Sequence, residues 1–420
     1  MIEGGRPLSG TVRANGNKNG ALPILAGCLL TEEPVQLTNV PRIRDVETML
    51  SLLRSLGAEA DWTGDNEVRV HAQEVSNEVD ADLASRIRAS FLFAGPLLAR
   101  FGRASVAPPG GDVIGRRRLD PHIHAFAELG ATIDIGARYE LSGTLRGAHI
   151  HLDEPSVMGT ENAVMAASLT PGRTMISNAA SEPHVQDLCK FLVTLGASID
   201  GIGSNVLHIT GVDRLGGGTH SISPEHIEVG SFIGMAAVTG GDVRIEGIEA
   251  EDLWPVLPVF RKLGIEVELG DTWVRVPPGQ ELVIQDDLGG AIPTLQDGPW
   301  PQFPADLTSI AVVVATQAKG TVLVFEKMFE SRLFFVDKLV SMGARIILCD
   351  PHRVVITGPS QLIGQRHSSP DIRAGMAMVI AALCAEGRST IGDAYQIDKG
   401  YERIDERLRA LGADIRRVES

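Results

Sequence analysis

One hydrophobic pattern recurs along the whole chain. Segments such as DVETMLSLLRSLGA (45–58) and ERIDERLRALGA (402–413) place apolar residues at helical spacing and end in leucine followed by glycine. The glycine suits a left-handed helix C-cap, and an alternating strand pattern follows it. The equivalent glycines lie 66 to 79 residues apart, at Gly57, Gly130, Gly196, Gly264, Gly343 and Gly412. This regularity predicts six repeats of about 70 residues, each with a partly exposed helix.

A second helical pattern occurs once per repeat and is apolar nearly all round. Its copies, such as NKNGALPILAGCLL (17–30) and DIRAGMAMVIAALCAEG (371–387), are rich in alanine and glycine, which predicts buried and closely packed helices. Polar residues gather at the expected N-terminal ends of these copies, namely Lys18, Asn19, Arg88, Glu161, Asn162, Asp306 and Arg373. A cation at a helix N-terminus opposes the helix dipole, whereas an anion is favoured there. The basic residues of this set therefore indicate a phosphate-binding site rather than helix caps.

Composition and charge narrow the class of protein. The 420 residues are 44% hydrophobic and 22% charged, which is ordinary for a globular enzyme. The net charge of −15 argues against nucleic-acid or anionic-membrane partners, so an anionic ligand has to meet a local cluster of Lys and Arg. No apolar run approaches about 18 residues, and the opening MIEGGRPLSG lacks the pattern of a signal peptide. We expect a cytoplasmic protein, whose oligomeric state the sequence does not specify.

Metal and cofactor motifs are not evident in the sequence. The cysteines at 28, 189, 349 and 384 are scattered, with no metal-binding spacing, and three of them lie in apolar contexts typical of buried thiols. Two HIH stretches, at 122–124 and 149–151, fit a loop or a strand better than a metal site. We expect no metal and no organic cofactor.

The segment PPGGDVIGRRRLDPH (108–122) carries the most distinctive chemistry. It joins a Pro-Gly-Gly turn, the acid Asp112, three consecutive arginines at 116–118 and a second acid, Asp120. The guanidinium fork suits phosphate, and the turn suits a loop that moves. This combination predicts a carboxyl group in a mobile loop beside phosphate-binding arginines.

Several motifs in order resemble the UDP-N-acetylglucosamine enolpyruvyl transferase family. The matching segments are 16–41, 86–102, 108–122, 153–167, FPADLTS (303–309), DIRAG (371–375) and 397–413. The resemblance implies a two-domain inside-out α/β barrel with three repeats in each domain. We expect one domain at 19–228, carrying the loop near 108–122, and a second at 1–18 and 229–420. It also implies transfer of enolpyruvate from phosphoenolpyruvate to the 3′-hydroxyl of UDP-N-acetylglucosamine by addition and elimination, the first committed step of peptidoglycan precursor synthesis.

The resemblance implies roles for individual residues of this chain. The candidate catalytic residues are Lys18, Asp112, Asp306, Arg373 and Lys399. The candidate substrate-binding residues are Lys18, Asn19, Arg88, Arg117, Asp120, Ser156, Val157, Asp306, Glu330, Asp371 and Arg373, with Arg332 beside Glu330. Lys18 and Arg373 would contact phosphoenolpyruvate, Asp306 the sugar hydroxyl, and Asp120, Ser156 and Val157 the uridine diphosphate. The chemistry agrees, because addition to C2 needs one group to protonate C3 and another to deprotonate the hydroxyl.

Four departures from the family pattern stand out. Asp112 replaces the usual cysteine, which fosfomycin alkylates in the family, so resistance to that drug is expected. Lys399 replaces an arginine and loses the bidentate fork. The loop reads Arg116-Arg117-Arg118 instead of a single arginine followed by proline. On the sugar-nucleotide side, Met158 lies in SVMGT and His226 stands where an arginine is typical.

The departures leave two alternatives beside the main hypothesis. One is the same chemistry on another nucleotide or sugar-nucleotide acceptor in secondary metabolism. The other is a weakly catalytic paralogue that binds the sugar nucleotide. The shikimate-pathway enolpyruvyl transferase is disfavoured, because NGNKNG (15–20) and RIRAS (86–90) stand where that enzyme has other motifs.

Overall fold

The computed structural model describes residues 1–111 and 118–418. By backbone proximity these residues divide into two compact units. We call residues 16–111 and 118–223 the central unit, and residues 1–15 and 224–418 the terminal unit. The sequence predicts domain boundaries after residues 18 and 228, whereas the chain passes from one unit to the other after residues 15 and 223.

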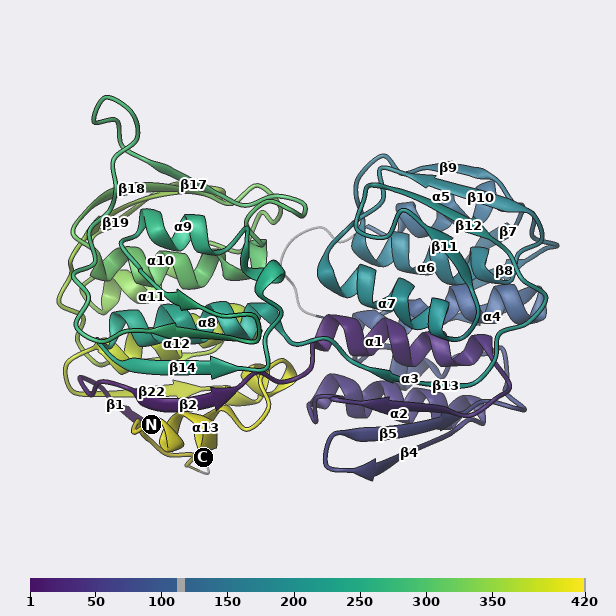
Figure 1. The fold of residues 1–420 in the computed structure, drawn as a ribbon, viewed down its shortest axis with the longest axis horizontal. Coiled ribbons are helices and arrows are strands. Elements are labelled where there is room, and N and C mark those ends of the chain that lie inside the picture. Colours follow the sequence, from purple (N-terminus) through teal and green to yellow (C-terminus); the bar gives the residue numbers. More distant parts are fainter. Residues whose placement is uncertain (112–117, 419–420) are drawn as a thin grey trace. The chain divides into compact units, whose positions relative to one another are not determined.

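The central unit is built from three small sheets and a set of helices (Figure 1). Its strands, in sheet order, are β13 (Gly218–Ser221), β3 (Val35–Thr38), β5 (Glu67–His71) and β4 (Glu59–Gly64); β6 (Arg103–Val106), β8 (Tyr139–Ser142) and β7 (Thr132–Ile135); and β11 (Ser198–Asp200), β12 (Val206–Thr210), β10 (Arg173–Ser177) and β9 (His149–His151). Its helices are α1 (Lys18–Gly27), α2 (Arg44–Leu56), α3 (Ala81–Ala84), α4 (Ala94–Phe101), α5 (Asp120–Glu128), α6 (Val157–Ser168) and α7 (Pro183–Thr194), with 3-10 turns η1 (Cys28–Leu30) and η2 (Arg88–Phe93).

The terminal unit has the same plan. Its sheets are β21 (Arg366–Ser368), β22 (Arg388–Gly392), β1 (Ile2–Glu3) and β23 (Asp414–Ile415); β15 (Glu268–Leu269), β16 (Trp273–Val276), β14 (Asp242–Glu246) and β2 (Ser9–Arg13); and β17 (Thr294–Gln296), β18 (Gly320–Phe325), β20 (Arg353–Gly358) and β19 (Ile346–Asp350). Its helices are α8 (His226–Val238), α9 (Leu257–Lys262), α10 (Thr308–Gln317), α11 (Val336–Ser341), α12 (Ile372–Cys384) and α13 (Ile404–Ala410), with 3-10 turns η3 (Ala250–Leu253), η4 (Ala305–Leu307) and η5 (Ala394–Lys399).

Both units are α/β structures, and the four-stranded sheets are mixed. Each contains one parallel pair, for example β14 with β2 and β10 with β9, beside antiparallel neighbours. Each unit has its own hydrophobic core. The predicted α/β class is therefore confirmed. Within the described residues, no helix has the length and apolar character needed to cross a bilayer.

The repeat glycines behave as the sequence predicts. All six have positive φ, between 85° and 107°, at the ends of α2, α5, α7, α9, α11 and α13. A left-handed residue at this position costs little only for glycine, which explains the recurrence of Leu-Gly and Met-Gly.

The apolar helices lie inside the units. In the terminal unit α8, α10 and α12 contact one another, and Figure 1 shows them enclosed by the strands. Their small residues allow this approach: a Cβ atom on Gly230 would lie 2.7 Å from Leu307 Cδ1, and one on Gly234 would lie 2.8 Å from Ile310 Cγ2. The close packing fixes η4 and the N-terminal ends of α8, α10 and α12, where the candidate site residues lie.

Two details of the predicted helices were wrong. The apolar copy that starts near Arg88 is not one helix, because η2 (Arg88–Phe93) precedes α4. Glu161 and Asn162 do not lie at a helix N-terminus. Helix α6 already begins at Val157, because Ser156 caps it by accepting a hydrogen bond from the Gly159 backbone N–H at 3.2 Å. Glu161 and Asn162 therefore lie in the second turn of the helix, and both side chains are buried.

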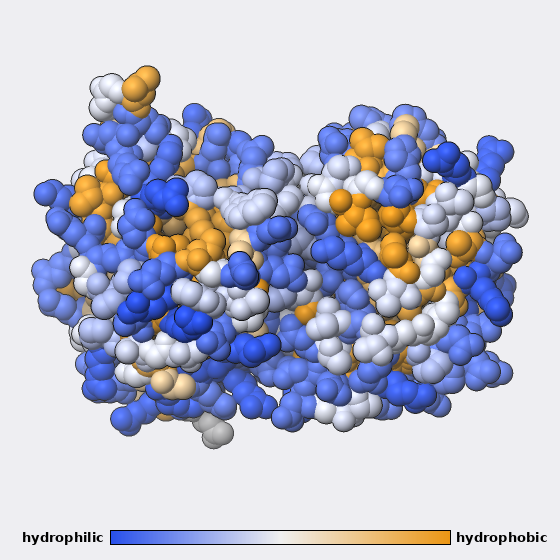
Figure 2. All heavy atoms as spheres, in the orientation of Figure 1, coloured by the Kyte–Doolittle hydropathy of each residue, from blue (hydrophilic) through white to orange (hydrophobic). Residues whose placement is uncertain are grey.

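The face drawn in Figure 2 is mostly hydrophilic, with hydrophobic side chains gathered in patches. One projection on the terminal unit is the connection between β16 and β17, closed by the bridge of Asp287 with Ala291. Leu288 is fully exposed there, and Ile292 is 59% exposed.

Candidate functional site

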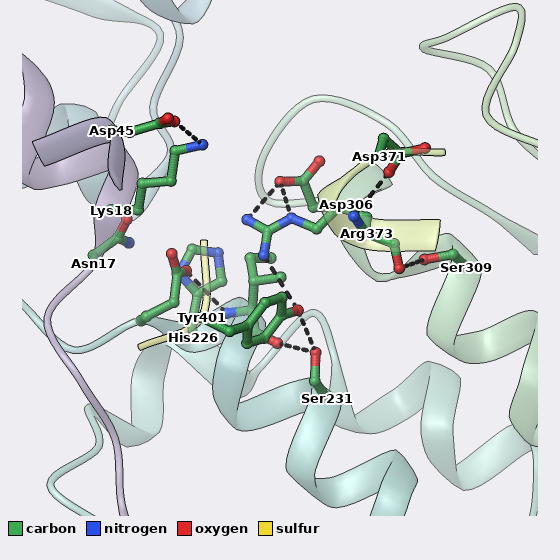
Figure 3. Close-up of polar contacts among 12 residues, drawn as sticks. Asn17, Lys18, Asp45, His226, Ser231, Asp306, Ser309, Asp371, Arg373 and Tyr401 are labelled. Atoms are coloured by element: carbon green, nitrogen blue, oxygen red, sulfur yellow. Dashed lines mark hydrogen bonds and ion pairs between the residues drawn. The ribbon is translucent and has the colours of Figure 1, made fainter. Parts of the chain in front are cut away.

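The terminal unit contains a carboxylate that lies between two guanidinium groups. Asp306 lies in η4, directly before α10. Its Oδ1 accepts a hydrogen bond from Arg332 Nη2 at 2.9 Å. Its Oδ2 accepts a hydrogen bond from Arg373 Nε at 2.9 Å, and Arg373 Nη2 is also 2.9 Å away (Figure 3). Charge-assisted contacts of this kind are strong and fix geometry. Asp306 therefore has a defined position in this unit.

Arg373 is fixed by the start of α12. Asp371 caps this helix and accepts hydrogen bonds from the backbone N–H groups of Arg373 at 2.8 Å and Ala374 at 2.9 Å. The guanidinium Nη1 donates to the Tyr401 hydroxyl at 3.3 Å, and Tyr401 is 2.9 Å from Ser231 Oγ. Burial acts to lower the pKa of Arg373, but the nearby Asp306, Tyr401 and Glu225 raise it above its ordinary value. Arg373 therefore stays a cation although it is only 5% exposed.

Arg332 has a buried carboxyl group behind it. Arg332 Nε lies 3.9 Å from Glu326 Oε2, and the Arg332 guanidinium covers the ring of Phe329 at 4.7 Å. Burial, followed by the contact with Asp297, raises the pKa of Glu326 to about 9. Near neutral pH, Glu326 is therefore protonated, and much of the positive charge of Arg332 remains for Asp306.

Lys18 is held by a carboxylate in the central unit. It is the first residue of α1, after Asn17, whose side chain accepts a hydrogen bond from the Gly20 backbone N–H at 3.2 Å. Lys18 Nζ lies 2.7 Å from Asp45 Oδ2, with both side chains largely buried (Figure 3). Asn19 follows as the second residue of the helix and is partly buried. The ion pair places the Lys18 ammonium at the N-terminal end of α1, as predicted.

Another polar group of the central unit adjoins the loop segment. Arg88, at the start of η2, donates from Nη2 to the Arg118 carbonyl oxygen at 3.0 Å. Arg118 Nε donates to Asp120 Oδ2 at 3.1 Å, and Arg118 Nη1 lies 3.9 Å from Asp153. Ser156 caps α6 and Val157 begins it. The structure thus brings Arg88, Arg118 and Asp120 together.

His122 is a neutral neighbour of this group. Burial, with a smaller effect of Arg88, lowers the pKa of His122 to about 3. Its Nδ1 accepts a hydrogen bond from Asn162 Nδ2 at 2.8 Å, and its ring meets Phe91 edge-on at 5.1 Å. His122 is therefore a packing residue in this unit rather than a cation.

The remaining predicted residues fall in three classes. Asp112, Arg116 and Arg117 lie outside the described residues. Glu330 is exposed in the segment after β18, and Lys399 is a half-buried residue at the end of η5, two positions before Tyr401. Of the unusual residues, Met158 is half-buried, and His226 is buried with its ring 5.8 Å from that of Trp300. Their predicted roles stay predictions.

Sequence reasoning gave no role to several residues of these clusters. Among them are Asp45, which pairs with Lys18, and Tyr401 and Glu225, which adjoin Arg373. Tyr401 lies inside the matched segment 397–413, so a search for polar partners of Arg373 could have included it. Asp45 and Glu225 carried no spacing signal, because each meets its partner through folding.

The histidines and cysteines of the described residues can be judged as possible metal ligands by their contacts and burial. His149 Nε2 and His151 Nδ1 both lie within 3.1 Å of Ser177 Oγ, and no group of three His, Cys, Asp or Glu side chains is suited to a metal among residues 1–111 and 118–418. Burial raises the pKa of Cys189 and of Cys384 to about 12. Cys28 is also buried, whereas Cys349 is exposed.

Comparisons with known proteins place the chain in a family. Residues 2–408 match the model of the EPSP synthase (3-phosphoshikimate 1-carboxyvinyltransferase) family. The chain is 58% identical over 420 residues to a UDP-N-acetylglucosamine 1-carboxyvinyltransferase of Bradyrhizobium diazoefficiens, covering 100% of this chain and 97% of that protein. It is 55% identical over 417 residues to the enzyme of the same name from Treponema denticola, covering 99% and 98%.

Solved structures agree on the fold. The enolpyruvyl transferase NikO from Streptomyces tendae superposes with a TM-score of 0.89 at 24% identity, covering 99% of this chain and 97% of that one. An EPSP synthase from Acinetobacter baumannii gives a TM-score of 0.75 at 16% identity, covering 98% and 97%. At these identities the likeness shows the fold alone. The sequence relatives go further: the chain belongs to the UDP-N-acetylglucosamine 1-carboxyvinyltransferase family and is an enzyme of the enolpyruvyl transferase class.

Proposed function

We propose that this enzyme transfers the enolpyruvyl group of phosphoenolpyruvate to the 3′-hydroxyl of UDP-N-acetylglucosamine and releases phosphate. The observation that carries the proposal is the carboxylate of Asp306 held between Arg332 and Arg373. The names of relatives that are 50% to 58% identical support the same substrates. The reaction is the first committed step of peptidoglycan precursor synthesis, which links the enzyme to cell-wall biogenesis, cell shape and division. We propose that it acts in the cytoplasm, without nucleic-acid or membrane partners.

The proposed reaction has two steps. In the addition, the sugar 3′-oxygen bonds to C2 of phosphoenolpyruvate, the hydroxyl proton passes to Asp306, and Asp112 protonates C3. In the elimination, C3 loses a proton to the now ionised Asp112, the double bond re-forms, and the bond from C2 to the phosphate oxygen breaks as phosphate leaves. Arg373, Lys18 and Lys399 offset the carboxylate and phosphate charges of the donor, because cations stabilise charge that develops as phosphate leaves.

The acceptor side is assigned to the sugar nucleotide. Asp120, Ser156 and Val157 bind the uridine diphosphate, and Arg88 and Arg117 bind the substrates. Asn19, Glu330 and Asp371 complete the proposed binding set. Support comes from the contacts of Arg88 and Asp120 with Arg118, and from the α6 N-terminus that Ser156 caps.

Phosphate release with a panel of acceptors tests the proposed function. Phosphoenolpyruvate would be offered with UDP-N-acetylglucosamine, uridine nucleotides without the sugar, or shikimate 3-phosphate. We expect turnover with the first at a kcat/KM at least about 100-fold above the others, which corresponds to about 2.7 kcal/mol of discrimination. Turnover with a bare nucleotide would instead favour the same chemistry on another acceptor. Tight sugar-nucleotide binding without phosphate release would indicate a binding paralogue.

Asp112→Asn is expected to lower turnover by about 100-fold or more, because an amide cannot supply the proton to C3. Asp112→Cys should keep activity and become sensitive to fosfomycin, since a thiolate is a far better nucleophile than a carboxylate. The measurement is residual activity over time with and without the drug. Wild type should lose no activity to covalent modification, and the buried Cys189 serves as an internal control in mass spectrometry. Drug-labelled, inactivated wild type would refute the assignment of Asp112.

Lys399→Arg is expected to lower the KM for phosphoenolpyruvate several-fold, because a guanidinium fork replaces a point charge. Steady-state kinetics at fixed UDP-N-acetylglucosamine would measure the change, with the exposed Lys327→Arg as a matched control. An unchanged or higher KM would show that the site is adapted to lysine.

A further inference from the structure

Glu225 is a buried carboxyl group that the proposed reaction does not use. It is the N-cap residue of α8 and is only 3% exposed. Its Oε1 accepts a hydrogen bond from the Ile227 backbone N–H at 3.2 Å. Its Oε2 is buried and has no hydrogen-bond partner in the part of the chain that the structure describes. Burying a carboxylate oxygen without a hydrogen-bond donor raises the free energy of the folded protein. Protonation of the carboxyl group, or a ligand that donates to this oxygen, would remove that cost.

The charged groups around Glu225 oppose one another. Arg373, from α12, attracts its negative charge, whereas Asp306 and Glu228 repel it. The hydroxyl of Tyr401 and the ring of His226, whose Nδ1 lies 4.0 Å from Glu225 Oε1, are further titratable neighbours. Burial is the largest influence and raises the pKa of Glu225 to about 7, although Arg373 and the Ile227 hydrogen bond act in the opposite direction.

Arg373 is already committed to other partners in this state. Its Nε and Nη2 face Asp306, and its Nη1 donates to Tyr401. A second negative charge at Glu225 would further neutralise Arg373 and repel an incoming anion, whereas a protonated Glu225 would do neither.

We propose that Glu225 is a positioning residue that controls how Arg373 meets the anionic donor: the enzyme binds phosphoenolpyruvate with Glu225 protonated and loses affinity when Glu225 ionises. The identity of the anion rests on the proposed function. Binding of the donor brings further negative charge to Arg373, so it favours the protonated carboxyl and is accompanied by proton uptake at Glu225.

The size of the effect follows from the fraction of enzyme that is competent to bind. Because the pKa of Glu225 is about 7, about 90% of the Glu225 side chains are protonated at pH 6 and about 10% at pH 8. If only the protonated form binds, the apparent KM for the donor rises about tenfold between these pH values through Glu225 alone. Ionisation of the donor phosphate also changes KM with pH, but it does so equally in enzyme variants.

The test compares wild type with Glu225→Gln, which keeps an acceptor for the Ile227 N–H and cannot ionise. We expect the KM ratio of wild type to Glu225→Gln to rise about tenfold from pH 6 to pH 8, with little change in the kcat ratio. Glu225→Asp retains a titrating carboxyl and should keep a pH-dependent KM relative to Glu225→Gln. Glu281→Gln, an exposed carboxyl of the same unit, is the matched control and should follow wild type.

Calorimetry provides a readout that does not need turnover. Binding of phosphoenolpyruvate at pH 7.5, measured in two buffers of different ionisation enthalpy, should show more proton uptake in wild type than in Glu225→Gln. Equal proton uptake, or a flat KM ratio in a wild type that turns over, overturns the role of Glu225 and leaves the proposed function standing. A wild type that neither turns over nor binds phosphoenolpyruvate overturns both.

Discussion

Asp306→Ala is expected to lower kcat by about 10² to 10⁴-fold, while the Kd for UDP-N-acetylglucosamine changes no more than several-fold. Asp306 is the proposed acceptor of the hydroxyl proton, and Arg332 and Arg373 hold both of its oxygens at 2.9 Å. Removing the carboxylate removes the base and also leaves two buried guanidinium groups facing each other. Phosphate release measures kcat, and calorimetry measures sugar-nucleotide binding.

Asp306→Asn separates these two consequences. The amide keeps the shape of the side chain and one hydrogen-bond acceptor, but it has no charge and cannot take up the proton. It should therefore fold more stably than Asp306→Ala, because unpaired buried charges destabilise a protein by several kcal/mol. Its kcat should fall by a similar factor. Wild-type turnover in Asp306→Asn would contradict the assignment of Asp306 as the base.

Arg373→Lys is expected to reduce kcat/KM for phosphoenolpyruvate by about 10² to 10³-fold. The planar guanidinium of Arg373 contacts Asp306 through two nitrogens and donates a hydrogen bond to Tyr401 through the third. Lysine keeps the charge but cannot make these contacts together, and several kcal/mol of charge-assisted hydrogen bonding are lost. Stopped-time phosphate release at varied phosphoenolpyruvate would give the value.

The matched control is Arg366→Lys, an exposed arginine of β21 in the same unit, which should behave as wild type. A loss in Arg373→Lys that appeared only in thermal stability, with kcat/KM unchanged, would assign Arg373 a structural role.

The repeat architecture could be predicted because its signals are local. A leucine or methionine before each glycine, and the positive φ of that glycine, both belong to a single helix end. The apolar helices were also recognisable from composition alone. The 3-10 geometry of Arg88–Phe93 was not, because the same apolar residues suit either kind of helix when tertiary packing decides.

The polar residues inside α6 show why partners are harder to predict than elements. Asn162 was read as part of a helix end, yet its side chain accepts a hydrogen bond from the Gly95 N–H at 2.9 Å and donates to the Phe91 carbonyl oxygen at 3.0 Å. These partners lie about 70 residues away in sequence. A buried amide that joins α6 to α4 and η2 has no signature in its own neighbourhood.

The candidate site shows the same division. Motifs and the family resemblance identified Lys18, Asp306 and Arg373, but not what holds each of them. The ion pair of Lys18 with Asp45 and the contacts of Asp306 with Arg332 and Arg373 all span 26 residues or more. Such pairings come from the packing of segments that lie apart in the sequence, so they require the structure.

The most direct measurement is the product formed from phosphoenolpyruvate and UDP-N-acetylglucosamine in D₂O. Addition delivers a solvent deuteron to C3 and creates a methyl group, from which elimination removes either a proton or a deuteron. We therefore predict an enolpyruvyl ether of the sugar nucleotide, with one phosphate released per ether and deuterium at its vinyl carbon, visible by mass spectrometry and NMR. Asp306→Asn should form little of it. A wild type that forms no such ether, or an ether without deuterium at C3, would contradict enolpyruvyl transfer by addition and elimination.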